Sequence, residues 1–413
     1  MLKSHKKTIL ETLGRSSIHP FPARMAPGIA LEALGDSKSP LRVLDPMTGS
    51  GTVLAVARAK GHRAFGFDLD PLAVLIARVW THTVHAERMR DRAARVLDCA
   101  KKQFASLSAR QAYPSSADDE TREFIRYWFD EYSRRQLAAL ARVIGEVDDE
   151  ATRDVLWCGF SRLIITKQAG ASLAMDLSHS RPHKVFDRAP VKPFKKFTAA
   201  VEAVVANCPQ TGVGPVGPPT VVKLGDARRM CLPNESIDLV LTSPPYLNAI
   251  DYMRCSKFSL VWMGYAVSNI RKIRAGSIGT EASSEEATEA AWVRSLIKDL
   301  RLRPELTDRD YALLSRYVWD MSRALSEVSR VLRSGGRAVY VVGDSTVRGS
   351  FVPNSSIIAA IAQDHGLSLI SRQSRSLPAN RRYLPPPKRT ALDLAMNARM
   401  RREVVMVFDK LVA

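Results

Sequence analysis

The sequence predicts an α/β fold, a doubly wound sheet that carries a large, mostly helical insertion. Residues 41–70 read as strand, glycine-containing turn, helix and strand, which is the first half of an open α/β sheet. About 150 residues then separate Asp68 from the next predicted strand near Thr220. A β–α–β unit needs only about 30 residues. The intervening chain is therefore expected to have a structure of its own.

The first half of the sheet can be followed element by element. An apolar strand at 41–44 leads into the turn DPMTGSGT, and the helix that follows is expected to end at Gly61. The segment RAFGFDLD is predicted to be the second strand, ending in the acids Asp68 and Asp70. Pro71 suits the first turn of the next helix.

The second half is predicted from alternating apolar runs and turn residues. Strands are expected at 220–224, 236–242, 337–344, 367–371 and 403–408, and helices at about 309–332 and 355–364. The first of these strands leads into Gly225-Asp226, and the second leads into SPPY. Polar residues thus follow the strand ends, where open α/β sheets bind ligands.

The insertion divides the chain into three predicted regions. Residues 1–80 and 220–413 supply the sheet, and residues 81–219 form the insertion. Apolar residues at helical spacing predict helices in the insertion at 84–110, 120–145 and 150–168. Residues 169–192 are rich in Ser, His, Arg and Pro, and PQTGVGPVGPP has the composition of a linker. A smaller insertion at about 266–305 is expected to be a mobile loop.

The composition is that of a globular protein with a basic surface. Hydrophobic residues make up 46% of the 413 residues, and 61 Lys and Arg against 42 Asp and Glu give a net charge of +19. This excess favours a polyanion such as nucleic acid as the partner, although solubility alone could explain it. The sequence has no 18-residue apolar run and no apolar signal-peptide core, so we expect no membrane span and a cytoplasmic location.

The cysteines and histidines do not indicate a metal site or a disulfide framework. The five cysteines are odd in number and form no CxxC pair. The eight histidines do not cluster, apart from His179 and His183, which fit a basic loop better than a zinc site. Methylation of a base carbon would require a cysteine nucleophile after a proline, and no Pro-Cys pair occurs. We therefore expect no metal and reduced, mostly buried thiols.

The turn DPMTGSGT is the first motif with chemical content. Gly49 and Gly51 allow close approach of the backbone to a ligand, and amides at the start of the next helix favour an anion. Asp68, at the end of the second strand, is placed to accept both hydroxyls of a ribose. The turn has neither a Walker lysine nor the third glycine of the dinucleotide fingerprint. A nucleoside without a pyrophosphate fits this pattern better.

The second motif is Thr242-Ser243-Pro244-Pro245-Tyr246 at the end of a strand. Consecutive prolines fix φ and carry no amide donor, so their carbonyls are stiffly held acceptors. Ser243 adds a hydroxyl acceptor and Tyr246 adds a ring that can stack. These groups suit a planar ring that carries an amino group, whereas the same residues away from a sheet would form only a rigid turn.

The two motifs together resemble those of the amino-methyltransferases of DNA, which use S-adenosylmethionine to methylate cytosine N4 or adenine N6. The resemblance covers roughly 1–80 and 220–413 and implies a Rossmann-like methyltransferase sheet. It implies that the cofactor is bound by Phe21, Asp45, Met47, Thr48, Gly49, Ser50, Gly51, Thr52, Asp68, Leu69, Asp226, Ala227 and Ser243. Asp68 would hold the ribose and Asp226 would meet the adenine amine, and the segment HPFPARM would close over the cofactor. Ser243, Pro244, Pro245 and Tyr246 would act on the target base.

The motif order resembles that of members whose target-recognition region lies between the two motifs. A serine before PPY resembles the cytosine-N4 members, with adenine-N6 methylation as the alternative. An RNA or protein methyltransferase and a catalytically dead DNA-binding module remain the competing classes. The expected partner is double-stranded DNA; a cognate restriction endonuclease and the oligomeric state stay open.

Two basic segments are candidates for contact with DNA, 151–200 and 371–402. Short polar side chains mixed with Arg, Lys and His suit both phosphates and base edges. The expected contact residues are Lys167, Ser172, His179, Ser180, Arg181, Lys184, Arg381 and Arg382. A solvated charged surface is the simpler alternative for each segment.

Overall fold

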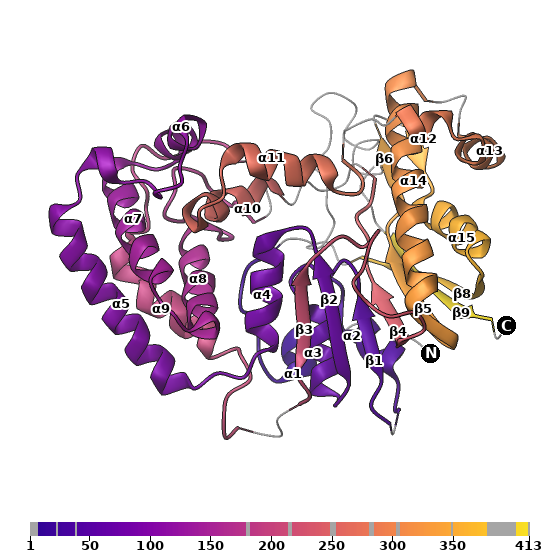
Figure 1. Ribbon diagram of the computed structural model, residues 1–413, viewed down its shortest axis with the longest axis horizontal. Coiled ribbons are helices and arrows are strands. Elements are labelled where there is room, and N and C mark those ends of the chain that lie inside the picture. Colours follow the sequence, from indigo (N-terminus) through magenta and orange to yellow (C-terminus); the bar gives the residue numbers. More distant parts are fainter. Residues whose placement is uncertain are drawn as a thin grey trace. The chain divides into compact units, whose positions relative to one another are not determined.

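A computed structural model describes most of the chain, as two compact units. The described residues are 7–21, 24–37, 39–178, 182–213, 217–247, 253–280, 285–302, 306–347, 350–377 and 402–411. Unit 1 comprises Met1–Glu32, Thr48–Leu224 and Tyr252–Arg274, and unit 2 comprises Ala33–Met47, Gly225–Asp251 and Ala275–Ala413. Figure 1 labels their elements. Short helix α2 (Pro27–Leu34) runs across the boundary in sequence.

Unit 1 contains two parallel strands and most of the helices. Strands β2 (Arg63–Asp68) and β3 (Thr220–Leu224) pair from Ala64↔Thr220 to Asp68↔Leu224. Its helices are α1 (Ile9–Leu13), α3 (Thr52–Ala59), α4 (Pro71–Thr81), α5 (Ala86–Ser106), η2 (Ala109–Gln111), α6 (Asp119–Trp128), α7 (Glu131–Gly145), α8 (Glu150–Ile164), α9 (Pro193–Val205), α10 (Met253–Leu260), η3 (Val261–Met263) and most of α11 (Val267–Gly276).

Unit 2 contains five strands of the central sheet, in the order β1-β4-β5-β9-β8. Their bounds are β1 (Arg42–Asp45), β4 (Ile237–Thr242), β5 (Leu332–Val342), β8 (Leu367–Ser376) and β9 (Arg402–Lys410). β1, β4 and β5 are parallel, whereas β9 is antiparallel to β5 and to β8. The unit also holds the ribbon β6 (Ser345–Val347) and β7 (Ser350–Val352), and helices α12 (Glu285–Glu289), α13 (Ala291–Asp299), α14 (Asp308–Val331) and α15 (Asn354–Asp364). The predicted α/β fold class is confirmed.

Helix starts in unit 1 follow from capping residues. Asp70 caps α4 by accepting a hydrogen bond from the Leu72 amide at 2.9 Å, and Pro71 occupies the first helical position. Asp130 caps α7 in the same way, accepting from the Ser133 amide at 3.0 Å. The helix predicted at 120–145 is therefore two helices, because Asp130 begins a new one.

The core of unit 1 joins α10 and η3 to the insertion helices through aromatic contacts. Trp262 is fully buried, with ring centroids 5.3 Å from Phe129 and 6.4 Å from Phe160. Phe258 on α10 packs 5.3 Å from Phe124 on α6. The insertion and residues 253–274 thus share one apolar core, although they are far apart in sequence.

Three expectations about local structure need correction. Helix α9 was not predicted; Pro193 starts it, and its buried face includes Phe197 and Val201. The segment at about 266–305, expected to be a loop, contains α11, α12 and α13 among its described residues. β5 begins at Leu332, directly after α14, and so includes the Ser-Gly-Gly sequence that was expected to be a turn. Among the described residues, no helix is both long enough and apolar enough to cross a membrane.

Gly51 is required where α3 meets α4, and its replacement by alanine should destabilise the protein. Its φ is +83°, and an added Cβ would lie 2.8 Å from the Cβ of Ala77 and 2.9 Å from its Cα. Backbone strain and overpacking should together lower the free energy of unfolding by about 2–4 kcal/mol. Chemical denaturation of Gly51→Ala without added ligand measures this loss.

Gly145→Ala is the matched control, because nothing lies within 4 Å of the added methyl group and Gly145 is the last residue of α7. It should change stability by less than about 1 kcal/mol. Equal stabilities of the two variants would contradict the packing argument.

Candidate functional site

In unit 1 the glycine turn and the acid at the end of β2 form one structure. The Gly49 amide donates to Asp68 Oδ2 at 2.8 Å, and the Asp70 amide donates to Asp68 Oδ1 at 2.9 Å. The Thr48 amide donates to the Phe67 carbonyl at 2.9 Å. The positive φ of Gly49, +48°, is part of this turn. Backbone amides therefore hold the Asp68 carboxylate in a fixed orientation.

The Asp68 carboxylate retains capacity for a ligand. Burial raises its pKa, and the amide hydrogen bonds from Asp70, Gly49 and Leu69 oppose that rise. A carboxylate has about four acceptor sites, and the two amide bonds described above use one on each oxygen. The side chain is partly exposed. It can therefore accept hydroxyl donors such as those of a ribose.

Other side chains of the turn also fit a polar ligand. The hydroxyls of Thr48 and Thr52 are buried and have no hydrogen-bond partner among the described residues. Buried polar atoms without partners are costly, so a ligand that bonds to them would be stabilised. The Phe21 ring lies against the turn, since a Cβ on Gly49 would be 3.5 Å from Phe21 Cε1. Ser50 is buried and Leu69 is partly exposed beside this turn.

In unit 2 one hydrogen bond joins the two sequence motifs. β1 and β4 are parallel neighbours with Leu44 opposite Val240. The Thr242 hydroxyl donates to Asp45 Oδ1 at 2.7 Å, and both side chains are buried, at 0% and 3% exposed. The Met47 amide donates to the same carboxylate oxygen at 3.2 Å. The structure thus places the start of DPMTGSGT beside the start of TSPPY.

Two tyrosines organise the SPPY segment. Tyr246 Oη and Ser243 Oγ are 3.3 Å apart, within hydrogen-bond distance. Burial, and then the negative charge of Glu403, raise the pKa of Tyr246, which keeps the phenol neutral. Tyr317 on α14 is fully buried and donates its hydroxyl to the Pro245 carbonyl at 3.2 Å. The segment therefore has a fixed backbone and a ring that remains partly exposed.

Asp226, expected to meet an adenine amine, already has a strong partner. Arg228 donates to both of its carboxylate oxygens, at 2.7–3.0 Å, and donates to Asp320 at 2.6 Å. Burial raises the pKa of Asp226, but the Arg228 hydrogen bonds outweigh this and lower it overall. The carboxylate is thus held ionised, and the neighbouring Ala227 is buried. Its contact with a cofactor stays a prediction.

The candidate DNA-binding residues are only partly described. Lys167 and Lys184 are exposed, and Lys184 Nζ lies 5.6 Å from the ring centroid of Tyr127. Ser172 is 0% exposed, so its hydroxyl is not on the surface and its expected contact with DNA is withdrawn. His179, Ser180, Arg181, Arg381 and Arg382 lie outside the described residues.

Sequence reasoning did not identify the residues that support the site. Tyr317 reads as one more apolar-face residue of a helix, and nothing in its spacing indicates the bond to Pro245. Ser256 on α10 donates to Asp70 at 2.5 Å, yet these residues are 186 positions apart. Burial, and then the charge of Asp68, raise the pKa of the Asp70 carboxyl to about 7. A pair of neighbouring acids therefore lies under the glycine turn.

This raised pKa predicts how stability changes with pH. A carboxyl that binds its proton more tightly in the folded protein contributes stability at low pH and loses it as pH rises through the folded pKa. Relative to Asp70→Asn, which keeps a capping oxygen, the native protein should lose stability between about pH 4 and about pH 7. Denaturant titrations across this range measure the difference.

Asp149→Asn serves as the matched control, because Asp149 also caps a helix but has a pKa lowered by its hydrogen bond to Thr152. The difference in stability between the native protein and Asp149→Asn should not fall between pH 4 and 7. If the difference in stability between the native protein and Asp70→Asn did not change with pH, the Asp70 carboxyl would be ionised throughout this range.

Known proteins resemble this chain over most of its length. No family model matches it. The type II methyltransferase M.MvaI of Kocuria varians is 23% identical over 389 residues, covering 88% of this chain and 84% of its own. The type II methyltransferase M.BsoBI of Geobacillus stearothermophilus is 20% identical, covering 82% and 75%. A solved S-adenosylmethionine-dependent methyltransferase of Methanosarcina mazei is 10% identical, covering 91% and 95%, with a TM-score of 0.32. The relatives confirm the resemblance that the motifs predicted, which is to the S-adenosylmethionine-dependent amino-methyltransferases of DNA.

Proposed function

We propose that this protein is a site-specific DNA methyltransferase that transfers a methyl group from S-adenosylmethionine to the N4 amine of a cytosine. One observation carries the proposal: the hydrogen bond from Thr242 to Asp45 brings the glycine-turn motif and the SPPY motif to neighbouring strand ends. The type II methyltransferase relatives support the reaction class. The serine before PPY supports cytosine over adenine, and adenine N6 is the alternative.

The proposed cofactor residues combine an acid with unpartnered hydroxyls. Asp68 would accept the ribose hydroxyls, and Thr48 and Thr52 would bond to the cofactor through their buried oxygens. Phe21 would cover it, and Asp45 and Asp226 supply further carboxylates. When bound, S-adenosylmethionine supplies a methyl group on a positively charged sulfur, which is already a good leaving group.

The SPPY segment would then orient the amine. An exocyclic amine is a poor nucleophile because its lone pair is conjugated with the ring. The Ser243 hydroxyl and the Pro244 carbonyl would accept its two hydrogens and so free the lone pair, while Tyr246 holds the ring by stacking. Tyr317 already occupies the Pro245 carbonyl, which leaves the Pro244 carbonyl as the proposed acceptor. Most of the rate gain would come from this positioning.

The target base has to leave the duplex to reach such a segment. We propose that the basic surface of the insertion, including Lys167 and Lys184, contacts the DNA backbone. Residues 179–181 are proposed to contact the DNA in the same way. The alternative is that the segment 371–402 makes this contact instead. A net charge of +19 suits this substrate.

Nucleoside mass spectrometry of DNA from cells that express the protein tests the proposal. N4-methylcytosine is the expected product, absent from cells that express Ser243→Ala. Detection of N6-methyladenine would still support a DNA methyltransferase, but with adenine N6 as the target in place of cytosine N4. Neither base, in cells that contain folded protein, would contradict the proposal.

Asp68→Ala should weaken binding of S-adenosylmethionine. Loss of charge-assisted hydrogen bonds to the ribose should cost about 1.5–3 kcal/mol, or more than tenfold in affinity. Isothermal calorimetry measures this change. Asp148→Ala, which removes an exposed acid from the loop before α8, should bind as the native protein does. An unchanged affinity in Asp68→Ala would remove Asp68 from the ribose site.

Tyr246→Ala should lower the turnover number strongly while leaving cofactor affinity nearly unchanged, because the ring is assigned to the base. Tyr246→Phe should be milder, since stacking survives without the hydroxyl. Methylation rates on a cognate duplex compare the two. If the phenylalanine variant is as inactive as the alanine variant, the hydroxyl matters more than the ring and the pocket assignment is wrong.

A further inference from the structure

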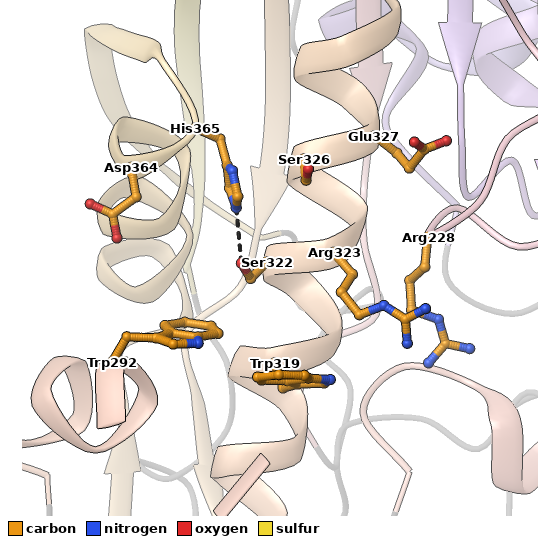
Figure 2. Close-up of a pocket in the computed structure, with 9 residues that line it drawn as sticks. All are labelled: Arg228, Trp292, Trp319, Ser322, Arg323, Ser326, Glu327, Asp364 and His365. Carbon is orange, nitrogen blue, oxygen red and sulfur yellow. Dashed lines mark hydrogen bonds between the residues drawn. The ribbon is translucent and has the colours of Figure 1, made fainter. Parts of the chain in front are cut away.

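Unit 2 contains a groove that the proposed reaction does not use. Helices α13, α14 and α15 and the residues after β3 form it, with a volume of about 530 Å³ (Figure 2). None of the residues assigned to the cofactor or the target base lines it. The lining residues are Arg228, Trp292, Trp319, Ser322, Arg323, Ser326, Glu327, Asp364 and His365.

Two tryptophans form an aromatic surface in this groove. Trp292 on α13 and Trp319 on α14 are stacked, with ring centroids 5.8 Å apart and planes at 22° (Figure 2). Trp292 is 39% exposed. Indole faces that remain accessible to solvent can stack with any planar aromatic ring, and stacking with a nucleobase contributes about 1–3 kcal/mol. The pair is therefore a platform for such a ring.

The charged residues of the groove differ in whether they are already neutralised. Arg228 is bound by Asp226 and Asp320, and Glu327 is bound by Arg330 at 2.7 Å. Arg323 is exposed and makes no ion pair with the described part of the chain, although its charge helps to lower the pKa of Asp226. Its guanidinium is thus accessible to an incoming anion, and a guanidinium suits phosphate.

Charged side chains lie at both ends of the groove. Arg323 lies beside Trp319 at one end, with Arg228 next to it, whereas Asp364 lies at the other end, on the side of Trp292 (Figure 2). Between them, Ser322 Oγ and His365 Nε2 are hydrogen-bonded at 2.9 Å. A ligand with an anionic end, a planar ring and an amino group on the ring would match this order.

We propose that the groove binds a nucleotide. Its base stacks on the exposed face of Trp292, which Trp319 supports from the other side; Arg323 binds the phosphate, and Asp364 accepts a hydrogen bond from an exocyclic amine of the base. The groove adjoins the proposed cofactor residues, because Arg228 lines it and also binds Asp226, but none of the residues assigned to methyl transfer lines it, so the proposal does not depend on that reaction.

Quenching of tryptophan fluorescence by dAMP and by deoxyadenosine tests the site. The same titrations on Asp68→Ala, whose proposed cofactor site is weakened, measure the contribution of that site. dAMP should quench saturably. Arg323→Gln should lower the affinity for dAMP at least fivefold and leave the affinity for deoxyadenosine unchanged. Trp292→Ala should lower the affinity for both. Arg309→Gln, which alters another exposed arginine of α14, should match the native protein.

Two results would overturn the proposal: no saturable quenching by dAMP at millimolar concentration, or the native dAMP affinity in Arg323→Gln. Replacing an exposed arginine leaves the fold intact, so this variant decides the matter even if Trp292→Ala does not fold. A single-stranded oligodeoxyadenylate, titrated in parallel, identifies the source. Tighter binding of the strand, lost in Arg323→Gln, indicates a DNA strand, and tighter binding of dAMP indicates a free nucleotide. Methylation assays of the same variants separate this outcome from failure of the proposed function.

Discussion

The hydrogen bond from the Thr242 hydroxyl to Asp45 is the constraint on which the proposed site depends. A buried carboxylate is costly unless it is hydrogen-bonded, and Asp45 receives donors from Thr242 and from the Met47 amide. These bonds fix the ends of β1 and β4 relative to each other. Both functional motifs leave the sheet at these two points, so their starting positions in unit 2 follow from one buried pair. Tyr317 extends the constraint by holding Pro245, two residues into the second motif.

In unit 1, backbone amides hold the carboxylate of Asp68. The Asp68 carboxylate accepts from Gly49 and Asp70, and Asp70 in turn caps α4 and accepts from Ser256. Glycine is required at this turn because its backbone takes positive φ and approaches α4 closely. The acid that would bind the ribose is thus oriented before any ligand arrives. Preorganisation of this kind reduces the free energy that binding would otherwise spend on ordering.

The sequence predicted the sheet elements well because their signals are local. Apolar runs that end in glycine, proline or acid marked β1, β2 and β4, and Pro71 marked the start of α4. Local signals could not reveal the bond between Tyr317 and Pro245 or that between Ser256 and Asp70, since both join residues far apart in the chain. The burial of Ser172 was missed for the same reason, because a serine in a polar segment reads as exposed. The helices of 266–305 were missed because Gly, Ser and Glu in that segment suggested a loop.

A double-mutant cycle on Asp45 and Thr242 tests the central constraint most directly. Thr242→Val keeps the shape of the side chain and removes the donor, and Asp45→Ala removes the acceptor. The free energies of unfolding of the native protein, the two single variants and the double variant, measured at one pH, give the coupling between the two side chains. We predict a coupling of about 1–3 kcal/mol, with the double variant little less stable than the worse single variant. Losses that simply add would contradict the account.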